Sequence, residues 1–237
     1  MANIVVAHGA WSAAWAWKKV RPLMAAAGHS LFTPTYTGLG ERAHLASRDN
    51  DLETHIADVL GVITYEDLRD VILVGHSYGG MVASGVADRA RDRVAGLIYL
   101  DAFVPANGQA LIDFVPEPEK SRLLDSVKTG NGGDGWRVTP NPAPPDTSAE
   151  DLEWIGKFRM PQSAKCFTQP LRLQAALTLP RVYVHCMRFA DKKPFAQFDT
   201  ATRDKPGWRN FDLDASHSPN VTAPAALMDV LQRSLAG

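Results

Sequence analysis

The sequence predicts an α/β fold with a doubly wound, mostly parallel sheet and a helical lid inserted between late strands. Short apolar runs rich in β-branched residues recur along the chain, and segments with helical spacing separate most of them. Residues 103–179 contain no comparable apolar run, and this gap predicts the lid. The length of 237 residues suits one such domain.

The composition excludes several classes of protein. Lys and Arg number 25 against 26 Asp and Glu, and this balance argues against a nucleic-acid partner. The two cysteines, Cys166 and Cys186, do not make a disulfide framework and are expected to be buried thiols. No apolar run is long enough to span a membrane. No basic start or cleavage site precedes the first apolar run, so we expect a cytoplasmic protein.

The first elements follow from apolar runs and helical periodicity. Ile4–Ala7 is expected to be a strand buried on both faces, followed by a helix over Trp15–Ala27. A second short strand is expected over residues 29–33 and a loop over 34–50. Asp51 is a good N-cap for the next helix, in which apolar residues recur at helical spacing.

The later elements continue the alternation. Thr222 is expected to cap a final helix that holds Pro224 in its first turn. Because parallel strands need crossover connections, we expect helices on both sides of the sheet. The other elements expected here are a helix from about Met81 to Arg89 and strands over Val71–Val74, Val94–Leu100, Arg181–Cys186 and Trp208–Leu213.

Residues 103–179 divide the chain into a core, residues 1–102 and 180–237, and an insertion. The insertion holds a Gly-rich run, a Pro-rich run and an amphipathic helix near Ala149–Phe158. A loop this long is usually functional, and this one would lie above the carboxyl ends of the strands, where ligands bind. We therefore interpret it as a lid. The alternative is a small helical subdomain that only packs on the sheet.

The motif Gly75-x-Ser77-x-Gly79 directly follows an apolar run and precedes a helical segment. Its glycines permit a strained strand-to-helix turn that lifts the serine hydroxyl above the sheet. The turn also aims the N–H of Tyr78 at a reacting oxygen. A second such donor is expected in the loop after the first strand, where Gly9 would let the backbone turn and leave the N–H of Ala10 facing the site.

A serine hydroxyl is a poor nucleophile until a base takes its proton. His217 lies just beyond the last expected strand, so its loop can bring an imidazole over Ser77. No spacing of His, Cys, Asp and Glu suggests a metal site, and no cofactor is expected. The other histidines are set aside as solvent or loop residues (His29, His44, His55), as pointing away from Ser77 (His76) or as lying within a strand (His185).

Two aspartates could orient the imidazole of His217. Asp191 follows the strand Arg181–Cys186 by a few residues, the usual place for this carboxylate. Asp101 ends the preceding strand, a place that some serine hydrolases use instead. We lean slightly to Asp101, because the loop before Asp191 carries that carboxylate further from its strand than expected.

Aromatic residues suggest a small-molecule substrate that is mainly apolar. Trp11 lies next to the expected oxyanion loop, and the insertion adds Trp136, Trp154 and Phe158, which could roof a pocket. These four residues are the candidate substrate-binding residues. A homodimer is the one macromolecular assembly left open.

The chain resembles the α/β-hydrolase superfamily over nearly its whole length. Within it, the similarity is to the compact branch of plant methylesterases, hydroxynitrile lyases and bacterial esterase relatives. The resemblance implies Ser77 as nucleophile, His217 as base, and the N–H groups of Ala10 and Tyr78 as oxyanion donors. The segments that carry it are Val5–Trp11, Gly38-x-Gly40, Gly75–Gly80, Tyr99–Pro105 and Ser216-His217.

The same resemblance separates hydrolysis from cyanohydrin cleavage. The lyases of this branch have a threonine just after the early histidine and a lysine just after the catalytic one, where this chain has Gly9 and Ser218. We therefore expect a serine hydrolase that cleaves a carboxylic ester, or a related amide or carbamate, through an acyl-enzyme. The alternatives are a non-hydrolytic small-molecule binder on the same fold and, disfavoured by Gly9 and Ser218, a hydroxynitrile lyase.

Overall fold

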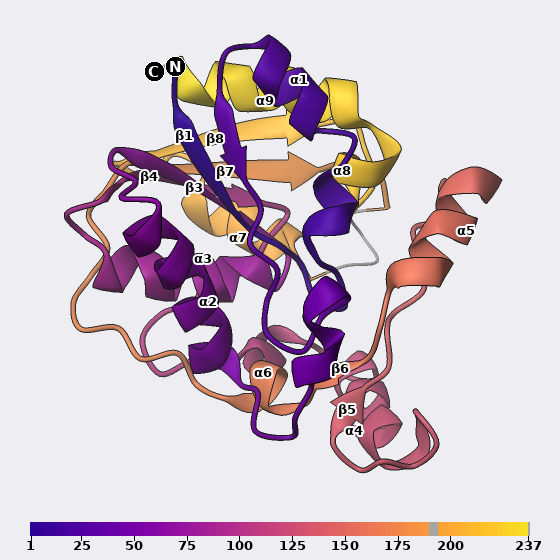
Figure 1. Ribbon diagram of the computed structural model, residues 1–237. Coiled ribbons are helices and arrows are strands. Elements are labelled where there is room, and N and C mark those ends of the chain that lie inside the picture. The colour runs from indigo at the N-terminus through magenta and orange to yellow at the C-terminus, as the bar shows by residue number, and fades with distance from the viewer. Residues whose placement is uncertain (190–193, 237) are drawn as a thin grey trace.

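The computed structural model describes residues 1–189 and 194–236, and its centre is a sheet of six parallel strands (Figure 1). The strand order β2-β1-β3-β4-β7-β8 places the first strand inside the sheet. This arrangement confirms the predicted fold class. The strands are β1 (Asn3–Ala7), β2 (Ser30–Phe32), β3 (Val71–His76), β4 (Val94–Leu100), β7 (Arg181–Cys186) and β8 (Trp208–Leu213).

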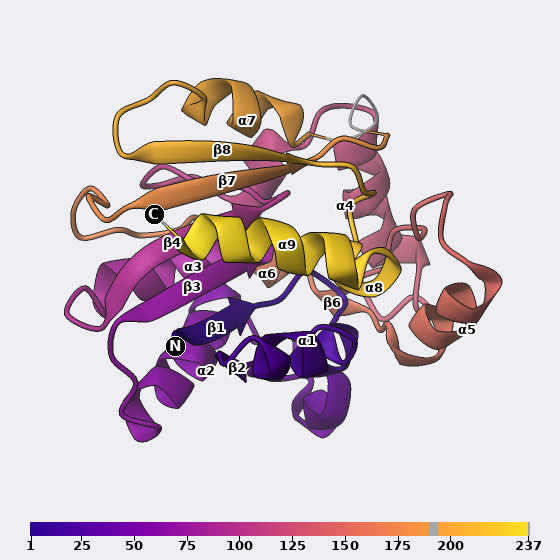
Figure 2. The same ribbon diagram turned by 90° about the horizontal axis from the view of Figure 1, so that it is seen from above.

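Helices cover both faces of the sheet (Figures 1 and 2). Successive side chains of a strand point to opposite faces, and β1 shows the consequence. Val5 packs in one apolar cluster, whereas Ile4 and Val6 pack in the other. The first cluster includes side chains of α2 (Leu52–Tyr65), α3 (Gly79–Arg89) and α7 (Ala196–Thr202); the second includes side chains of the 3-10 helix η1 (Ala14–Trp17), α1 (Arg21–Ala26) and α9 (Pro224–Leu235).

Two predicted helix starts differ from the structure and one agrees. Asp51 caps α2, and its Oδ1 accepts the N–H of Thr54 at 2.9 Å. The helix expected over Trp15–Ala27 is instead η1 followed by α1, because Pro22 cannot donate a backbone hydrogen bond and prevents one continuous helix. Thr222 does not cap α9. Its hydroxyl donates to the carbonyl of Ser218, and Thr222 ends the short helix α8 (Pro219–Thr222).

The segments 34–50 and 103–179 hold short elements. The first contains the 3-10 helix η2 (Gly40–Leu45). In the second, the amphipathic helix falls where the sequence predicts it, as α5 (Ala149–Phe158). Figure 2 shows α4 (Glu119–Thr129) and α5 beyond the carboxyl ends of β7 and β8. The remaining elements there are η3 (Leu111–Phe114), the antiparallel pair β5 (Arg137–Val138) and β6 (Gln162–Ser163), and α6 (Lys165–Thr168).

Both cysteines are buried and free, as the sequence predicts. Within residues 1–189 and 194–236, every helix falls short of the length and apolar content that crossing a bilayer requires.

Candidate active site

Ser77 occupies a strained turn between β3 and α3. Its φ of +55° lies in the left-handed region, which a non-glycine residue seldom adopts. A Cβ on Gly79 would lie 1.9 Å from the carbonyl oxygen of Ala7, and one on Gly75 would lie 2.8 Å from that of Gly79. The clash predicted for side chains at both motif glycines is therefore present, and the turn depends on their absence.

The loop after β8 brings His217 to Ser77. The two side chains meet with His217 Nε2 and Ser77 Oγ 3.0 Å apart. The ring of Phe195 stacks on the imidazole of His217, with centroids 4.6 Å apart and planes 11° apart. His76 Nε2 pairs with the carbonyl oxygen of His217 at 2.7 Å, so that ring nitrogen donates. Phe195 therefore packs on the face of the imidazole, and His76 holds the backbone of His217.

The sequence does not predict the contacts of His76 and Phe195 with His217. His76 does not simply point away from Ser77, because its ring centroid lies 5.0 Å from that of His217. Both residues contact His217, in the loop after β8. Neither is close to this loop in the sequence, so no local pattern predicts the contact. The place of His76 directly before Ser77 is the only signal that could have found it.

Asp101 contacts the other nitrogen of His217. This residue follows β4 with a φ of +41° and is 1% exposed. Its Oδ2 lies 2.6 Å from His217 Nδ1, while its Oδ1 accepts the N–H of Cys186 at 3.4 Å. A carboxylate only accepts, so the Nδ1 of His217 carries the proton and its Nε2 is left to accept from Ser77. Asp191, the other candidate, lies outside the described residues.

Ala10 and Tyr78 lie on the two loops that flank Ser77. Tyr78 is the N-cap residue of α3, and a Cβ on Gly9 would lie 3.4 Å from the Cβ of Ser77. Within the described part of the chain, neither the N–H of Ala10 nor that of Tyr78 donates to a protein acceptor. The left-handed turn falls at Trp11, with a φ of +59°, and not at Gly9 as expected. Gly9 is needed for space, since its Cβ would also lie 3.0 Å from His76 Nδ1.

Residues of the segment 103–179 hold the loop that carries Ala10. The N–H of Trp11 donates to Gln162 Oε1 at 2.9 Å, and its indole Nε1 donates to the carbonyl of Val138 at 3.1 Å. Gln162 and Val138 belong to the β5–β6 pair. Gln162 is therefore a positioning residue that sequence reasoning missed, since its partner lies far away in the chain.

Two buried histidines lie beneath these loops. His8 Nε2 accepts the N–H of Tyr36 at 3.2 Å, and His55 Nδ1 pairs with the hydroxyl of Tyr78 at 2.9 Å. Burial lowers the pKa of His8 to about 3 and that of His55 to about 4, because a buried imidazolium loses its hydration. His55 is thus a neutral core residue in α2, and the solvent or loop position expected for it is wrong.

Ser77 and His217 open into a cavity of about 680 Å³. Apolar side chains dominate its wall, and they come both from strand-end loops and from residues 103–179. Two charged side chains, Glu119 and Arg159, are among its described lining residues. The apolar lining includes Trp11, Trp15, Phe103, Leu111, Val115, Leu123, Ile155, Phe167, Phe195 and Val221.

Of the predicted substrate-binding residues, Trp11 lines this cavity, but Trp136, Trp154 and Phe158 are not among the described residues that line it. Trp154 and Phe158 instead pack against Trp15, with centroids 5.4 and 5.6 Å away. Trp136 packs against Arg137, whose guanidinium carbon lies 5.0 Å from its ring. On α5, Ile155 lines the cavity, whereas Trp154 and Phe158 lie on the neighbouring stripe of the helix. Periodicity predicts that such stripes exist, but it does not tell which of them meets the cavity.

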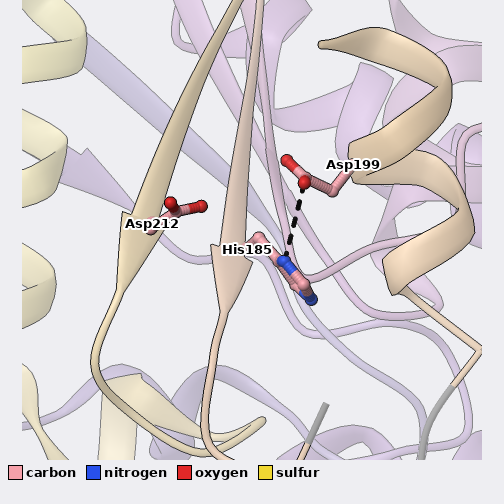
Figure 3. A group of neighbouring side chains, drawn as sticks. All are labelled: His185, Asp199 and Asp212. Carbon is pink, nitrogen blue, oxygen red and sulfur yellow. Dashed lines mark ion pairs between the residues drawn. The ribbon is translucent and has the colours of Figure 1, made fainter. Parts of the chain in front are cut away.

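A second polar cluster joins β7, α7 and β8, although no spacing of His, Cys, Asp and Glu in the sequence predicts a metal site. Figure 3 shows His185, Asp199 and Asp212, whose ligand atoms lie within 4.8 Å of one another. Arg203 donates to Asp199 at 2.9 Å and to Asp212 at 2.7 Å. Because this one guanidinium donates to both carboxylates, the cluster is an ion-pair network between α7 and the sheet edge.

The model of the alpha/beta hydrolase family matches residues 4–230 of this chain. The chain belongs to this family. A carbendazim-hydrolysing esterase of Nocardioides is 38% identical over 98% of both chains. A pyrethroid hydrolase of Sphingobium wenxiniae is 29% identical over 97% of this chain and 86% of its own.

Comparison with solved structures also gives the fold of this family. A methylesterase from Arabidopsis superposes with a TM-score of 0.77 at 24% identity, over 100% of this chain and 99% of its own. The resemblance to the esterase branch is therefore confirmed, as is the predicted class of enzyme, a carboxylesterase-like hydrolase.

Proposed function

We propose that this α/β hydrolase is a serine hydrolase that cleaves a carboxylic ester of a small, mainly apolar substrate through an acyl-enzyme. A related amide or carbamate is an alternative substrate. One observation carries the proposal: His217 joins the hydroxyl of Ser77 at 3.0 Å to the carboxylate of Asp101 at 2.6 Å, at the wall of an apolar cavity.

The reaction begins when Ser77 Oγ attacks the substrate carbonyl while His217 Nε2 takes its proton. Asp101 holds the imidazole in the required tautomer and stabilises the imidazolium that forms. The oxyanion develops against the N–H groups of Ala10 and Tyr78. His217 then protonates the leaving alcohol, activates a water molecule and regenerates Ser77 with release of the acid.

We propose that residues 103–179 act as the lid over this reaction. The support is that Leu111, Leu123, Ile155 and Phe167 line the same cavity as Ser77. Closing an apolar wall over the site excludes water and strengthens the hydrogen bonds to the oxyanion. The β5–β6 pair in this segment also holds Trp11, next to the donor Ala10.

Labelling and turnover together test the proposal. A serine-directed organophosphonate is expected to modify Ser77 in the folded protein and to leave the Ser77→Ala variant unmodified. Short-chain p-nitrophenyl esters are expected to be hydrolysed by the wild type and not by that variant. Carbendazim and a pyrethroid, which the names of two relatives mention, extend the substrate panel. Intact folded protein without labelling or Ser77-dependent turnover would contradict the proposal and favour the non-hydrolytic binder.

The hydroxynitrile lyase is the second alternative to exclude. A threonine side chain in place of Gly9 would meet His76 and Ser77, and no lysine follows His217 to hold a departing cyanide. The expected result with mandelonitrile is no cyanide release above the uncatalysed rate. Ser77-dependent cyanide release would revive the lyase.

A further inference from the structure

Arg159 brings a positive charge to the wall of the cavity. It follows the last residue of α5, and its Nη1 donates to the carbonyl oxygen of Asn141 at 2.7 Å. Its guanidinium carbon lies 5.6 Å from the centroid of the Trp11 ring. Burial disfavours the charged form and lowers the pKa of Arg159 to about 10, so the side chain remains protonated at neutral pH.

No carboxylate of the described residues pairs with this guanidinium. Glu119 is the one acidic residue among the described residues that line the cavity. Its charge is already paired, because Arg122 Nη2 lies 2.6 Å from its Oε1 and Arg122 Nε lies 2.8 Å from its Oε2. Arg159 therefore leaves the described wall of the cavity with one uncompensated positive charge. Arg159 is half-buried, and a charge that has lost part of its hydration is stabilised by a counter-charge.

The position of Arg159 relates this charge to the reacting groups. The N–H of Met160, the next residue, donates to the carbonyl of Trp11 at 3.4 Å. Trp11 in turn follows Ala10, a proposed oxyanion donor. An anion held by Arg159 would thus lie beside the Trp11 ring, within the same cavity as Ser77 but on the part of its wall that the insertion supplies.

We propose that Arg159 is a specificity-determining residue that binds a carboxylate carried by the substrate, away from the ester carbonyl that Ser77 attacks. This inference rests on the proposed function and narrows its substrate class. The planar guanidinium matches a carboxylate with two parallel hydrogen bonds. The apolar wall would contact the carbon chain between the ester and the carboxylate. Half-esters of dicarboxylic acids are the simplest substrates of this kind.

Two esters of equal length test the proposal. Monomethyl suberate ends in a carboxylate where methyl octanoate ends in a methyl group. The ratio of their kcat/KM values therefore isolates the contribution of the carboxylate. A lost charge-assisted hydrogen bond costs about 1.5–3 kcal/mol, which corresponds to roughly 10- to 100-fold. Arg159→Leu is expected to lower the ratio of monomethyl suberate to methyl octanoate by this factor, mainly through KM. Arg159→Lys keeps the charge without the planar fork and should retain part of the preference.

Lys157→Leu provides the matched control. It removes one positive charge from the last turn of α5, two residues before Arg159, at an exposed position where the ammonium lies 5.5 Å from the Phe158 ring. Its ratio of kcat/KM should equal that of the wild type. An unchanged ratio in Arg159→Leu, or an equal fall in Lys157→Leu, would overturn the proposal.

Binding to a variant that cannot hydrolyse the ester distinguishes the carboxylate site from the hydrolase activity. Calorimetric titration of Ser77→Ala with monomethyl suberate should give a measurable Kd. In the double variant, which also carries Arg159→Leu, this Kd should be higher by the same factor. Loss of hydrolysis with this binding intact would overturn only the hydrolase. Hydrolysis of both esters with no effect of Arg159 on binding would overturn only the carboxylate site. The melting temperature of each variant verifies that it is folded.

Discussion

His217 Nδ1 lies 2.6 Å from Oδ2 of Asp101, a residue that follows β4. The carboxylate is 1% exposed and also accepts the N–H of Cys186 at the end of β7. Strands β4 and β7 are neighbours in the sheet, so Asp101 lies where both strands end. The order of the strands thereby gives the carboxylate of Asp101 a second hydrogen bond, from the strand next to its own.

Asp101→Asn should lower kcat for an ester by about 10³- to 10⁴-fold, because the amide would favour the wrong imidazole tautomer. The fold should persist, since the amide oxygen can still accept the N–H of Cys186. Asp191→Asn, measured beside it, should retain near-normal turnover. A large loss in Asp191→Asn with normal turnover in Asp101→Asn would transfer the role of the acid to Asp191.

Gly79→Ala should unfold or strongly destabilise the protein, by about 3 kcal/mol or more. Its methyl group would lie 1.9 Å from the carbonyl oxygen of Ala7, and backbone cannot yield as a flexible side chain does. Gly61→Ala, inside α2, meets no atom within 4 Å and should stabilise by about 0.5–1 kcal/mol. Urea unfolding of both variants measures the contrast, and equal effects would contradict this account of the turn.

Stability should fall as the pH is lowered from about 6.5 towards 4. The unfolded chain protonates His8 and His55 in this range, whereas the folded protein, with pKa values of about 3 and 4, does not. Each contributes up to about 1.4 kcal/mol per pH unit. His55→Gln should reduce the slope of unfolding free energy against pH, and His44→Gln, at an exposed site, should leave it unchanged. A slope unaffected by His55→Gln would show that this residue is not buried as a neutral group.

Gln162→Leu should lower both stability and turnover. It removes the acceptor of the buried Trp11 N–H, and an unsatisfied donor costs about 1–3 kcal/mol. Loss of this contact would also loosen the loop that carries Ala10, so kcat should fall more than KM rises. Gln232→Leu makes the same chemical change at an exposed position of α9 and should alter neither quantity. Normal kcat in a destabilised Gln162→Leu would contradict the positioning role.

The sheet and the turn at Ser77 could be predicted because their signals are local. Val94–Leu100 and Arg181–Cys186 are strands as predicted, since a mainly apolar run is enough to mark a strand buried on both faces. Trp208–Leu213 is also a strand as predicted, although it lies at the edge of the sheet and only Leu213 in it is buried. The motif glycines likewise report a clash within one turn.

The walls of the cavity could not be predicted in the same way. Trp154 and Arg159 both belong to the α5 region, yet only Arg159 lines the cavity. Which stripe of a helix faces a cavity depends on how the helix docks, and docking depends on partners far away in the sequence. The contacts of His76 with His217 and of Gln162 with Trp11 were missed for the same reason.

The placement of Asp101 has a consequence for how such proteins diversify. Ser77 and Asp101 each follow one of the two strands of a single β-α-β unit, β3-α3-β4, so their spacing is set before the chain enters residues 103–179. That segment can lengthen, shorten or change its side chains while the distance between the two residues stays fixed. Substrate range can thus evolve, or be engineered, in one stretch of chain while the spacing of Ser77 and Asp101 is inherited intact from another, provided that Val138 and Gln162 keep their contacts with Trp11.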